Sequence, residues 1–322
     1  MKEKIFISVI LIVGLLFWQC LVFAQDSCSE IIVAYDNLVS SRWYFVAYID
    51  PQKNIKIYGN DPGYKPREIN NKNAIKLAAN YENCFYETQE HAIYVEGFEN
   101  RMLAEYLPGV KQLVTTDETA FALMEDGTVR DLYGCNTQSY SEFDRWEDVV
   151  YLTTGRNFLV GLRGDGSVVV DGNTVLINKR KVKKWKNVKQ IHAGASNIIA
   201  LTYDNKILFE NSYYDLTKKE YSKPKKKIDF SSWTDVVQVT AGHNFAAGLR
   251  SDGTVVLAGW EEYYVNEYGM DKALSWTDIV YIEAYQDCLL GVKSDGQIVA
   301  IIAPRSGYDI LEEDKKYILL TK

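Results

Sequence analysis

The chain has 322 residues, of which 47% are hydrophobic and 13% aromatic, and its formal net charge is −7. This hydrophobic content is ample for a folded core and excludes an intrinsically disordered chain. The three histidines (His91, His192 and His243) and the lack of a Cys-x-x-Cys pair leave no metal-binding pattern in the sequence. We therefore expect neither a metal ion nor another cofactor.

Residues 1–24 have the pattern of a secretory signal peptide. Lys2 and Lys4 form a basic start, an almost unbroken apolar run follows, and Val22-Phe23-Ala24 places small residues before Gln25. This pattern predicts export with cleavage after Ala24, and hence a secreted or cell-surface protein. An N-terminal membrane anchor is the alternative, because residues 5–24 are just long enough to span a bilayer.

After this segment, one sequence pattern recurs at intervals of about 40 residues. Its clearest copy starts at Trp233-Thr-Asp-Val-Val and continues to Gly248-Leu-Arg-Ser-Asp-Gly253-Thr-Val-Val. Two degenerate copies come first, one around Asp50 and one in which Glu90-His91 replaces the Asp-Gly pair. Aligned on that pair, the five clear copies are centred on Gly127, Gly166, Asn205, Gly253 and Gly296. Together these copies indicate an array of seven similar units.

Each unit is predicted to be β structure. In the clearest copy, residues 236–240, 245–250 and 254–258 read as three short strands, with a less regular fourth segment before the next unit. An Asp-Gly pair between alternating apolar residues predicts a hairpin with a type I′ turn. No sustained apolar period of 3.6 residues is present, so helix should be scarce. Three or four short strands in each unit predict an all-β, seven-bladed β-propeller.

A single propeller domain is expected over residues 25–322, after the signal peptide at 1–24. The blades of a propeller pack only on their neighbours, so a chain of this length need not divide into two domains. We expect the C-terminal segment Tyr317-Ile-Leu-Leu-Thr to help latch the ring by sharing a blade with the first strand, since an unlatched ring leaves an open edge. The seven units are predicted at residues 31–72, 73–108, 109–146, 147–185, 186–233, 234–276 and 277–322.

The repeated cassette is V-x-x-(V/I)-x-A-G-x-x-(H/N)-(apolar)-x-(A/G)-L-(R/K)-x-D-G-x-V, closed by W-x-(D/N)-(V/I). It resembles the repeat of the regulator of chromosome condensation family, and the resemblance covers roughly residues 31–322. The resemblance implies a seven-bladed propeller, and with the predicted signal peptide it points to a secreted bacterial type. The residues with which the eukaryotic founder acts on a small GTPase have no match here, so that activity is not expected.

Positive charge is concentrated in one part of an otherwise acidic chain. Residues 179–227 contain 14 Lys or Arg and four acidic residues. Most of these basic residues fall in two clusters, at residues 179–186 and 218–227. Because the two clusters occupy the same part of consecutive units, we expect them on neighbouring sectors of one face. Such a patch would attract an anionic cell-surface polymer, although well-solvated loops explain it equally well. The candidate binding residues are Lys179, Arg180, Lys181, Lys183, Lys184, Lys225, Lys226 and Lys227.

The segments between hairpins are also rich in aromatic residues, which are enriched at protein interfaces. We expect Trp260, Tyr263 and Tyr264 to be exposed and to bind a protein partner, together with Tyr213, Tyr214 and Tyr140. The resemblance offers a precedent, because a secreted propeller of this superfamily, the β-lactamase inhibitory protein of the second type, grips its target through aromatic loop residues. By contrast, we expect the repeat tryptophans to pack between blades: Trp146, Trp185, Trp233 and Trp276.

Four cysteines would remain after removal of the signal peptide. Cys28 precedes the first unit and Cys288 lies in the last, so closure of the ring would bring them together, and this disulfide is the pairing to test. Cys84 and Cys135 lie in adjacent units and could also pair, or Cys84 could be an ordinary core residue.

No nucleophile with a plausible base, no phosphate-binding loop and no other catalytic motif is present. We therefore expect a secreted, non-catalytic and monomeric propeller that binds an unidentified protein through one loop face. Binding of an anionic cell-surface polymer through the Lys/Arg-rich loops is the alternative. Nucleic acid is not expected as a partner, because export would separate the two and no nucleic-acid module is recognisable.

Overall fold

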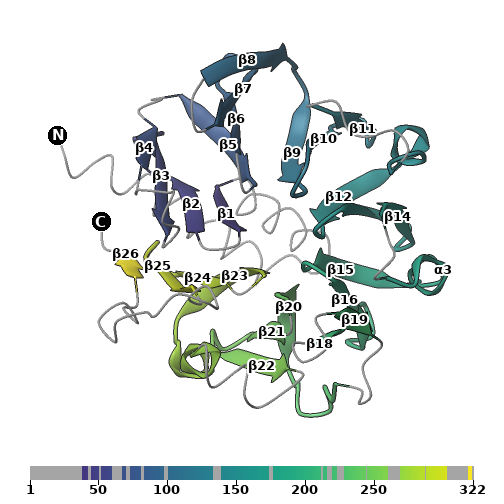
Figure 1. Ribbon diagram of the computed structural model, residues 1–322. Coiled ribbons are helices and arrows are strands. Elements are labelled where there is room, and N and C mark those ends of the chain that lie inside the picture. Colours follow the sequence, from purple (N-terminus) through teal and green to yellow (C-terminus); the bar gives the residue numbers. More distant parts are fainter. Residues whose placement is uncertain are drawn as a thin grey trace.

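The computed structural model describes residues 38–42, 45–50, 52–59, 67–69, 73–80, 83–97, 101–132, 139–173, 177–211, 213–215, 220–222, 228–243, 245–259, 269–286, 288–302 and 318–320. Seven antiparallel sheets of three or four strands are present in this part of the chain, and they follow one another around a central axis (Figure 1). The predicted all-β propeller architecture is therefore confirmed. The predicted signal peptide and Cys28 lie outside the described residues.

The two degenerate units also form complete blades. The first is β1 (Val39–Arg42), β2 (Phe45–Ile49), β3 (Ile55–Gly59) and β4 (Arg67–Ile69), and the second is β5 (Ala74–Ala79), β6 (Asn83–Thr88), β7 (Ala92–Gly97) and β8 (Arg101–Tyr106). In each of them the four strands pair in sequence order, antiparallel throughout.

Blades three to seven repeat an inner, a middle and an outer strand. Blades three and four are β9 (Val110–Thr115), β10 (Ala120–Met124), β11 (Val129–Asp131) and β12 (Val149–Thr154), β13 (Phe158–Arg163), β14 (Val168–Gly172). Blades five and six are β15 (Val188–Ala193), β16 (Asn197–Thr202), β17 (Ile207–Asn211) and β20 (Val236–Ala241), β21 (Phe245–Arg250), β22 (Val255–Gly259). Blade seven is β23 (Ile279–Tyr285), β24 (Cys288–Lys293), β25 (Ile298–Ile302) and β26 (Ile318–Leu320).

The connections between blades carry the remaining elements. A small hairpin of β18 (Tyr213–Asp215) and β19 (Glu220–Ser222) follows blade five. The described part of the chain has one short α-helix, α3 (Lys179–Val182), and two 3-10 turns, η1 (Phe143–Arg145) and η2 (Met270–Ser275). None of these helices is long and apolar enough to cross a membrane. The expected scarcity of helix therefore holds for the described residues.

The hairpin turn differs from the predicted type I′ turn. In blade six the Arg250 carbonyl accepts from the Gly253 N–H at 3.0 Å, and only Gly253, at φ +82°, has a positive φ in this turn. The Asp252 carboxylate accepts from the backbone N–H of Thr254 at 2.9 Å. The chain therefore forms a type I turn followed by one left-handed residue, Gly253. The hydrogen bond to Asp252 stabilises this turn, and Asp252 itself does not adopt a positive φ.

The repeat tryptophans pack between blades, as predicted. Trp146 is buried in a cluster that joins blades three and four, and Trp276 in one that joins blades six and seven. A glycine of the middle strand makes room for the ring, since a Cβ at Gly161 would lie 3.1 Å from Trp146. Trp185 is buried between blades four and five, and Trp233 packs half-buried against a cluster of blades five and six.

Side chains near the axis join the inner strands of successive blades. The inner strand is the edge of its sheet, so its outward N–H and C=O groups need partners. The Gln112 amide donates to the Leu152 carbonyl and accepts from the Leu152 N–H, both at 3.0 Å. Gln238 binds both backbone groups of Ile282 in the same way, at 2.9 Å. These clamps replace the missing strand pairing at the centre of the ring.

Other side chains of the inner strands make a single hydrogen bond to the next blade. In four pairs of neighbouring blades, a side chain accepts from a backbone N–H of the next blade at 2.8–3.3 Å. The acceptors and donors are Ser40 and Ala79, Thr153 and Ala193, His192 and Ala241, and Thr240 and Ala284. The ring is therefore tied from blade to blade by a repeated polar contact.

Ring closure differs from the expected latch. The C-terminal strand β26 pairs with β25, so within the residues that the structure describes the last blade is built from consecutive strands and shares no strand with the first. The two blades meet instead through an apolar cluster in which Val39 of β1 packs with Tyr281 and Cys288 of blade seven. Figure 1 shows the yellow β26 on the outer side of blade seven, away from β1. Apolar packing therefore closes the seam between blades one and seven. Among the described strands of blade seven, β26 is the unpaired edge on the outside of the ring.

Candidate interaction face

The two ends of the ring differ in what they carry. Each inner strand ends, and each middle strand begins, at one end, which we name the loop face; it includes residues 116–119, 155–157 and 194–196. Because strands alternate in direction, the connections that leave the outer strands also start there. The hairpin turns, such as residues 251–254, lie at the other end, which we name the turn face.

Charged and aromatic side chains from distant blades meet at the centre of the loop face. The buried hydroxyl of Tyr285, in blade seven, donates to Asp117 Oδ1 of blade three at 2.9 Å. Arg156 of blade four donates from Nε to Asp117 Oδ2 at 3.0 Å. The aspartate therefore binds blades four and seven at once, and these side chains cross the mouth of the central channel.

The backbones of these central loops are also joined to one another. The Asp117 N–H donates to the Arg156 carbonyl at 2.9 Å, and the Arg156 N–H donates to the Ala195 carbonyl at 3.1 Å. In the same way the His243 N–H donates to the Gln286 carbonyl at 2.6 Å. The loop face is consequently a pre-organised surface, which lowers the entropic cost of binding.

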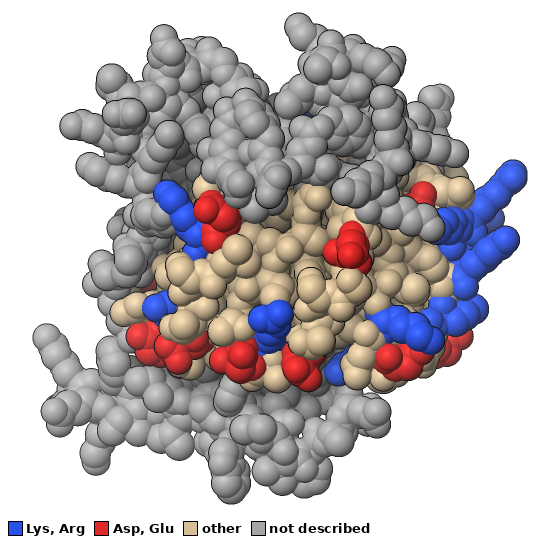
Figure 2. Space-filling model, turned by 90° about the horizontal axis from the view of Figure 1, so that it is seen from below, with Lys and Arg blue, Asp and Glu red and all other residues tan. Residues whose placement is uncertain are grey.

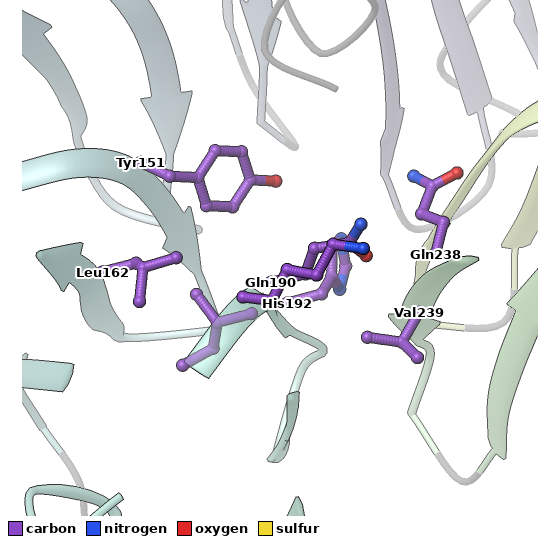
Figure 3. Close-up of a pocket in the computed structure, with 8 residues that line it drawn as sticks. Tyr151, Leu162, Gln190, His192, Gln238 and Val239 are labelled. Carbon is purple, nitrogen blue, oxygen red and sulfur yellow. The ribbon is translucent and has the colours of Figure 1, made fainter. Parts of the chain in front are cut away.

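The channel beneath this surface is narrow and is lined by both polar and apolar side chains. A hollow of about 40 Å³ lies among Ser40, Gln112, Thr153, His192 and Glu283, which come from inner strands around the ring. A second, of about 20 Å³, lies beside it, and Figure 3 shows Tyr151, Gln190 and Gln238 from three successive blades around it. One water molecule needs roughly 10–15 Å³ on this measure. These two hollows can hold a few waters but not a metabolite.

At the rim of the loop face, α3 presents the first basic cluster. Lys179 and Lys183 donate to the two oxygens of Glu142, at 3.1 and 2.6 Å, and Lys179 also lies 3.4 Å from Asp171 Oδ1. The hydrogen bond from Lys183 is the main reason that the pKa of Glu142 is lowered. Lys181 pairs with Glu210, whereas Arg180 and Lys184 are exposed. Only part of this cluster is therefore available to another molecule.

One predicted binding residue is buried. Tyr140 is 2% exposed, and its ring lies 5.2 Å from that of Phe121 within the cluster between blades three and four. It is a core residue, and its assignment to an exposed aromatic rim was wrong. The backbones of Tyr213 and Tyr214 form strand β18. Their side chains, together with Trp260, Tyr263, Tyr264, Lys225, Lys226 and Lys227, lie outside what the structure describes.

The cysteines give no reactive thiol in the described part of the chain. Cys84 is buried between blades one and two, and burial, followed by the nearby Glu96 carboxylate, raises the pKa of its thiol. Cys288 is also fully buried, in the seam between blades one and seven. Its suggested partner Cys28 and the remaining Cys135 are not described, so both disulfide pairings stay predictions. Among the described residues no three His, Cys, Asp or Glu side chains form a group able to hold a metal ion.

The turn face is acidic, and its aspartates have a structural role. Hydrogen bonds from the side chain and backbone of the residue two positions later lower the pKa of Asp126, Asp165 and Asp252. In the turn of blade five, a hydrogen bond from Lys206 lowers the pKa of Asp204 to about 2. Figure 2 shows acidic residues along one rim of the ring. Their hydrogen bonds within the hairpin turns explain why aspartates occupy these positions.

Sequence reasoning missed the central group of Asp117, Arg156 and Tyr285. No local pattern connects them, because the hydrogen bond between Tyr285 and Asp117 spans 168 positions. The repeat does offer one signal. Asp117 and Arg156 follow inner strands at equivalent positions of consecutive units, where the cassette has residues after Ala-Gly. Once the propeller is inferred, those positions have to converge at the mouth of the channel.

Comparisons with known proteins support the fold. No family model matches the sequence, and no curated protein matches it. Among solved structures, Prp20p from Saccharomyces cerevisiae is 15% identical, with 73% of this chain and 74% of that chain covered and a TM-score of 0.55. The CRINKLY WD40 ectodomain of the Arabidopsis thaliana receptor kinase ACR4 is also 15% identical, with 84% and 97% covered and a TM-score of 0.57. Human WBSCR16 is 11% identical, with 77% and 84% covered and a TM-score of 0.56.

Prp20p is the yeast RCC1 protein. RCC1 stands for regulator of chromosome condensation, the family whose repeat the cassette of this chain resembles. The chain has an RCC1-like propeller fold. At these sequence identities the similarity establishes the fold alone.

Proposed function

We propose that this chain is a non-catalytic protein-interaction module that binds a protein partner through its loop face. The observation that carries the proposal is the closure of the channel mouth by Tyr285, Asp117 and Arg156, with hydrogen bonds of 2.9 and 3.0 Å. A small-molecule site is usually a pocket of roughly 300–1,000 Å³. A rigid, polar surface over a channel with only small hollows suits a macromolecule better than a small substrate.

Two structures of one structural neighbour support a protein as the partner. Prp20p is described by its binding to Gsp1p and histones, and a second structure holds yeast RCC1 bound to Kap60. The predicted signal peptide supports a partner outside the cell, and we propose export on that ground. We propose that the aromatic residues at 260–264 take part in the same binding, on the ground of their sequence pattern alone.

The test compares two variants at opposite ends of one blade. Glu118 lies on the loop face between β9 and β10, and Glu125 lies in the hairpin turn that follows β10; both side chains are exposed. The full-length tagged chain, Glu118→Lys and Glu125→Lys would be used to capture proteins from a surface fraction, with quantification by mass spectrometry. We expect a discrete protein to be retained by the parent chain and by Glu125→Lys, and to be reduced with Glu118→Lys.

Salt distinguishes this function from the polymer alternative. Retention of the partner through contacts on the loop face should persist at high ionic strength, whereas capture through Lys/Arg-rich loops alone should disappear. A protein lost equally from both variants, or captured only at low salt, would contradict the proposed use of the loop face.

A further inference from the structure

Helix α3 is held rigidly at the rim of the loop face. Asn178 caps it by accepting from the Lys181 N–H at 3.1 Å, and Val182 and Trp185 anchor it in the cluster between blades four and five. Figure 2 shows Lys and Arg side chains projecting from one edge of the ring, the edge at which Figure 1 places α3. These cations are therefore presented by a fixed element rather than by a loose loop.

One side of this helical turn already binds a carboxylate. Lys179 and Lys183 are one helical turn apart, and they hold the two oxygens of Glu142 at 3.1 and 2.6 Å. The backbone bond from the Lys183 N–H to the Lys179 carbonyl, at 3.0 Å, sets this spacing. This arrangement shows that two cations with this spacing can bind one carboxylate.

Two further cations follow this pair in the sequence, although Lys184 lies past the end of α3 and its N–H donates to the Lys181 carbonyl at 3.1 Å. Arg180 and Lys184 are also four residues apart, both are exposed, and neither has an acidic partner within the described part of the chain. Lys186, also exposed, lies close enough to Asp165 to lower the pKa of that carboxylate. We propose that Arg180 and Lys184 form the docking point for an acidic segment of the protein partner. This inference rests on the proposed function and supplies the chemistry of the partner.

The charge around α3 favours a short acidic segment over a long polyanion. Polyanion binding gains its strength from the release of counterions at many contacts, so it needs an extended row of free cations. Here Lys179, Lys181 and Lys183 are already neutralised by carboxylates of the same chain. The whole chain has a formal net charge of −7, so a polymer that extended over much of its surface would meet repulsion. An acidic peptide that covers only Arg180 and Lys184 would avoid it.

The experiment measures binding of hexaglutamate to the full-length chain by titration calorimetry at low and moderate salt. The test variant is Arg180→Gln/Lys184→Gln. The matched control is Arg130→Gln/Lys206→Gln, which removes the same two residue types from exposed positions elsewhere. We expect the test variant to weaken binding of hexaglutamate by roughly three- to tenfold and the control to change it by less than twofold. Hexaglutamine, which has no charge, should not bind.

Three outcomes would overturn the inference: no binding of hexaglutamate by the parent chain, equal binding by the test variant, or tighter, Arg180- and Lys184-dependent binding of heparin than of hexaglutamate. The last would assign the site to a polyanion instead. The result is separable from the capture experiment with Glu118→Lys. If Glu118→Lys reduces capture of a protein, but hexaglutamate binding is unchanged by Arg180→Gln/Lys184→Gln, only this inference fails. If hexaglutamate binding depends on Arg180 and Lys184 but no protein is captured, the proposed function fails, and these two residues remain as a site for acidic peptides without an assigned partner.

Discussion

The side-chain amide of Gln112 binds both backbone groups of Leu152 in the neighbouring blade, with two hydrogen bonds of 3.0 Å. An amide side chain has one donor and one acceptor with the spacing of a peptide group, so it reproduces one rung of a β-ladder. Gln238 and Ile282 repeat the arrangement between blades six and seven. A propeller has no strand pairing between blades, and these glutamines supply it at the axis.

Replacing Gln112 with Ala should lower the free energy of unfolding by about 2–3 kcal/mol, because the N–H and C=O of Leu152 would be left buried without partners. Denaturant unfolding followed by tryptophan fluorescence measures this change. Gln89→Ala is the matched control, since Gln89 is exposed in a turn, and it should change stability by less than about 0.5 kcal/mol. Equal midpoints for the two variants would show that the clamp is not stabilising.

Tyr285→Phe removes one hydroxyl from the centre of the loop face and leaves the ring in place. The Tyr285 hydroxyl is buried and donates to Asp117 at 2.9 Å, so its loss should cost about 1 kcal/mol of folding free energy. Arg156 would still hold the other oxygen of Asp117. Thermal unfolding should show a lower Tm for this variant than for Tyr203→Phe, whose side chain is 45% exposed. Indistinguishable Tm values would argue against a stabilising cross-ring bond.

The hairpin turns predict opposite effects for two substitutions. Gly253 has φ +82°, and a Cβ there would lie 3.2 Å from the Ile279 backbone N, so Gly253→Ala should lower the free energy of unfolding by about 1–2 kcal/mol. Asn205 occupies the equivalent position in blade five with φ +58°. Asn205→Gly should be neutral or stabilising by up to about 1 kcal/mol, because glycine adopts positive φ without strain. Denaturant midpoints measured in parallel would refute the argument if both variants shifted in the same direction.

Much of the fold follows from local sequence. The repeat, the Asp-Gly turns and the recurring tryptophans predict the blades, because each depends on neighbouring residues. The turn type was wrong because the number of positive φ values depends on the hydrogen bond from the Thr254 N–H to Asp252, which the Asp-Gly pair alone does not reveal. The clamps have a visible signal, since Gln112, Gln190 and Gln238 recur at the third position of inner strands. Their partners become evident only once the ring is built.

The candidate site was harder to predict for a physical reason. Tyr140 and Tyr263 both lie between hairpins, and an aromatic residue there can either fill the space between blades or face solvent. Burial of Tyr140 depends on the ring of Phe121, from the neighbouring strand β10, which no spacing rule identifies. The free charge of the cluster around α3 was overestimated, because Glu142 approaches it from an earlier segment.

The pairing of Glu142 predicts a dependence on pH. Its pKa is lowered in the folded chain, mainly by the hydrogen bond from Lys183, so as the pH falls the unfolded state takes up a proton first. The stabilisation is therefore present above the ordinary pKa of a glutamate, about 4.3, and is lost as the pH falls through the lower value of the folded state. Glu142→Gln should make the decline of Tm below about pH 4.5 shallower. Parallel Tm profiles for the two proteins would contradict this.

The aromatic segment at residues 260–263, which the sequence predicts to bind the partner, gives the most direct test of the partner-binding surface. Trp260→Ala combined with Tyr263→Ala should weaken binding of a captured partner by about 2–4 kcal/mol if these side chains are anchors, since hot spots are dominated by buried aromatic residues. Tyr106→Ala is the control, because Tyr106 is 65% exposed on the outer strand of blade two. Circular dichroism should show that all variants keep the fold. Binding that resists salt but falls only with the double variant would assign the anchors to residues 260–263. Unchanged binding would leave the centre of the loop face, around Asp117 and Arg156, as the contact surface.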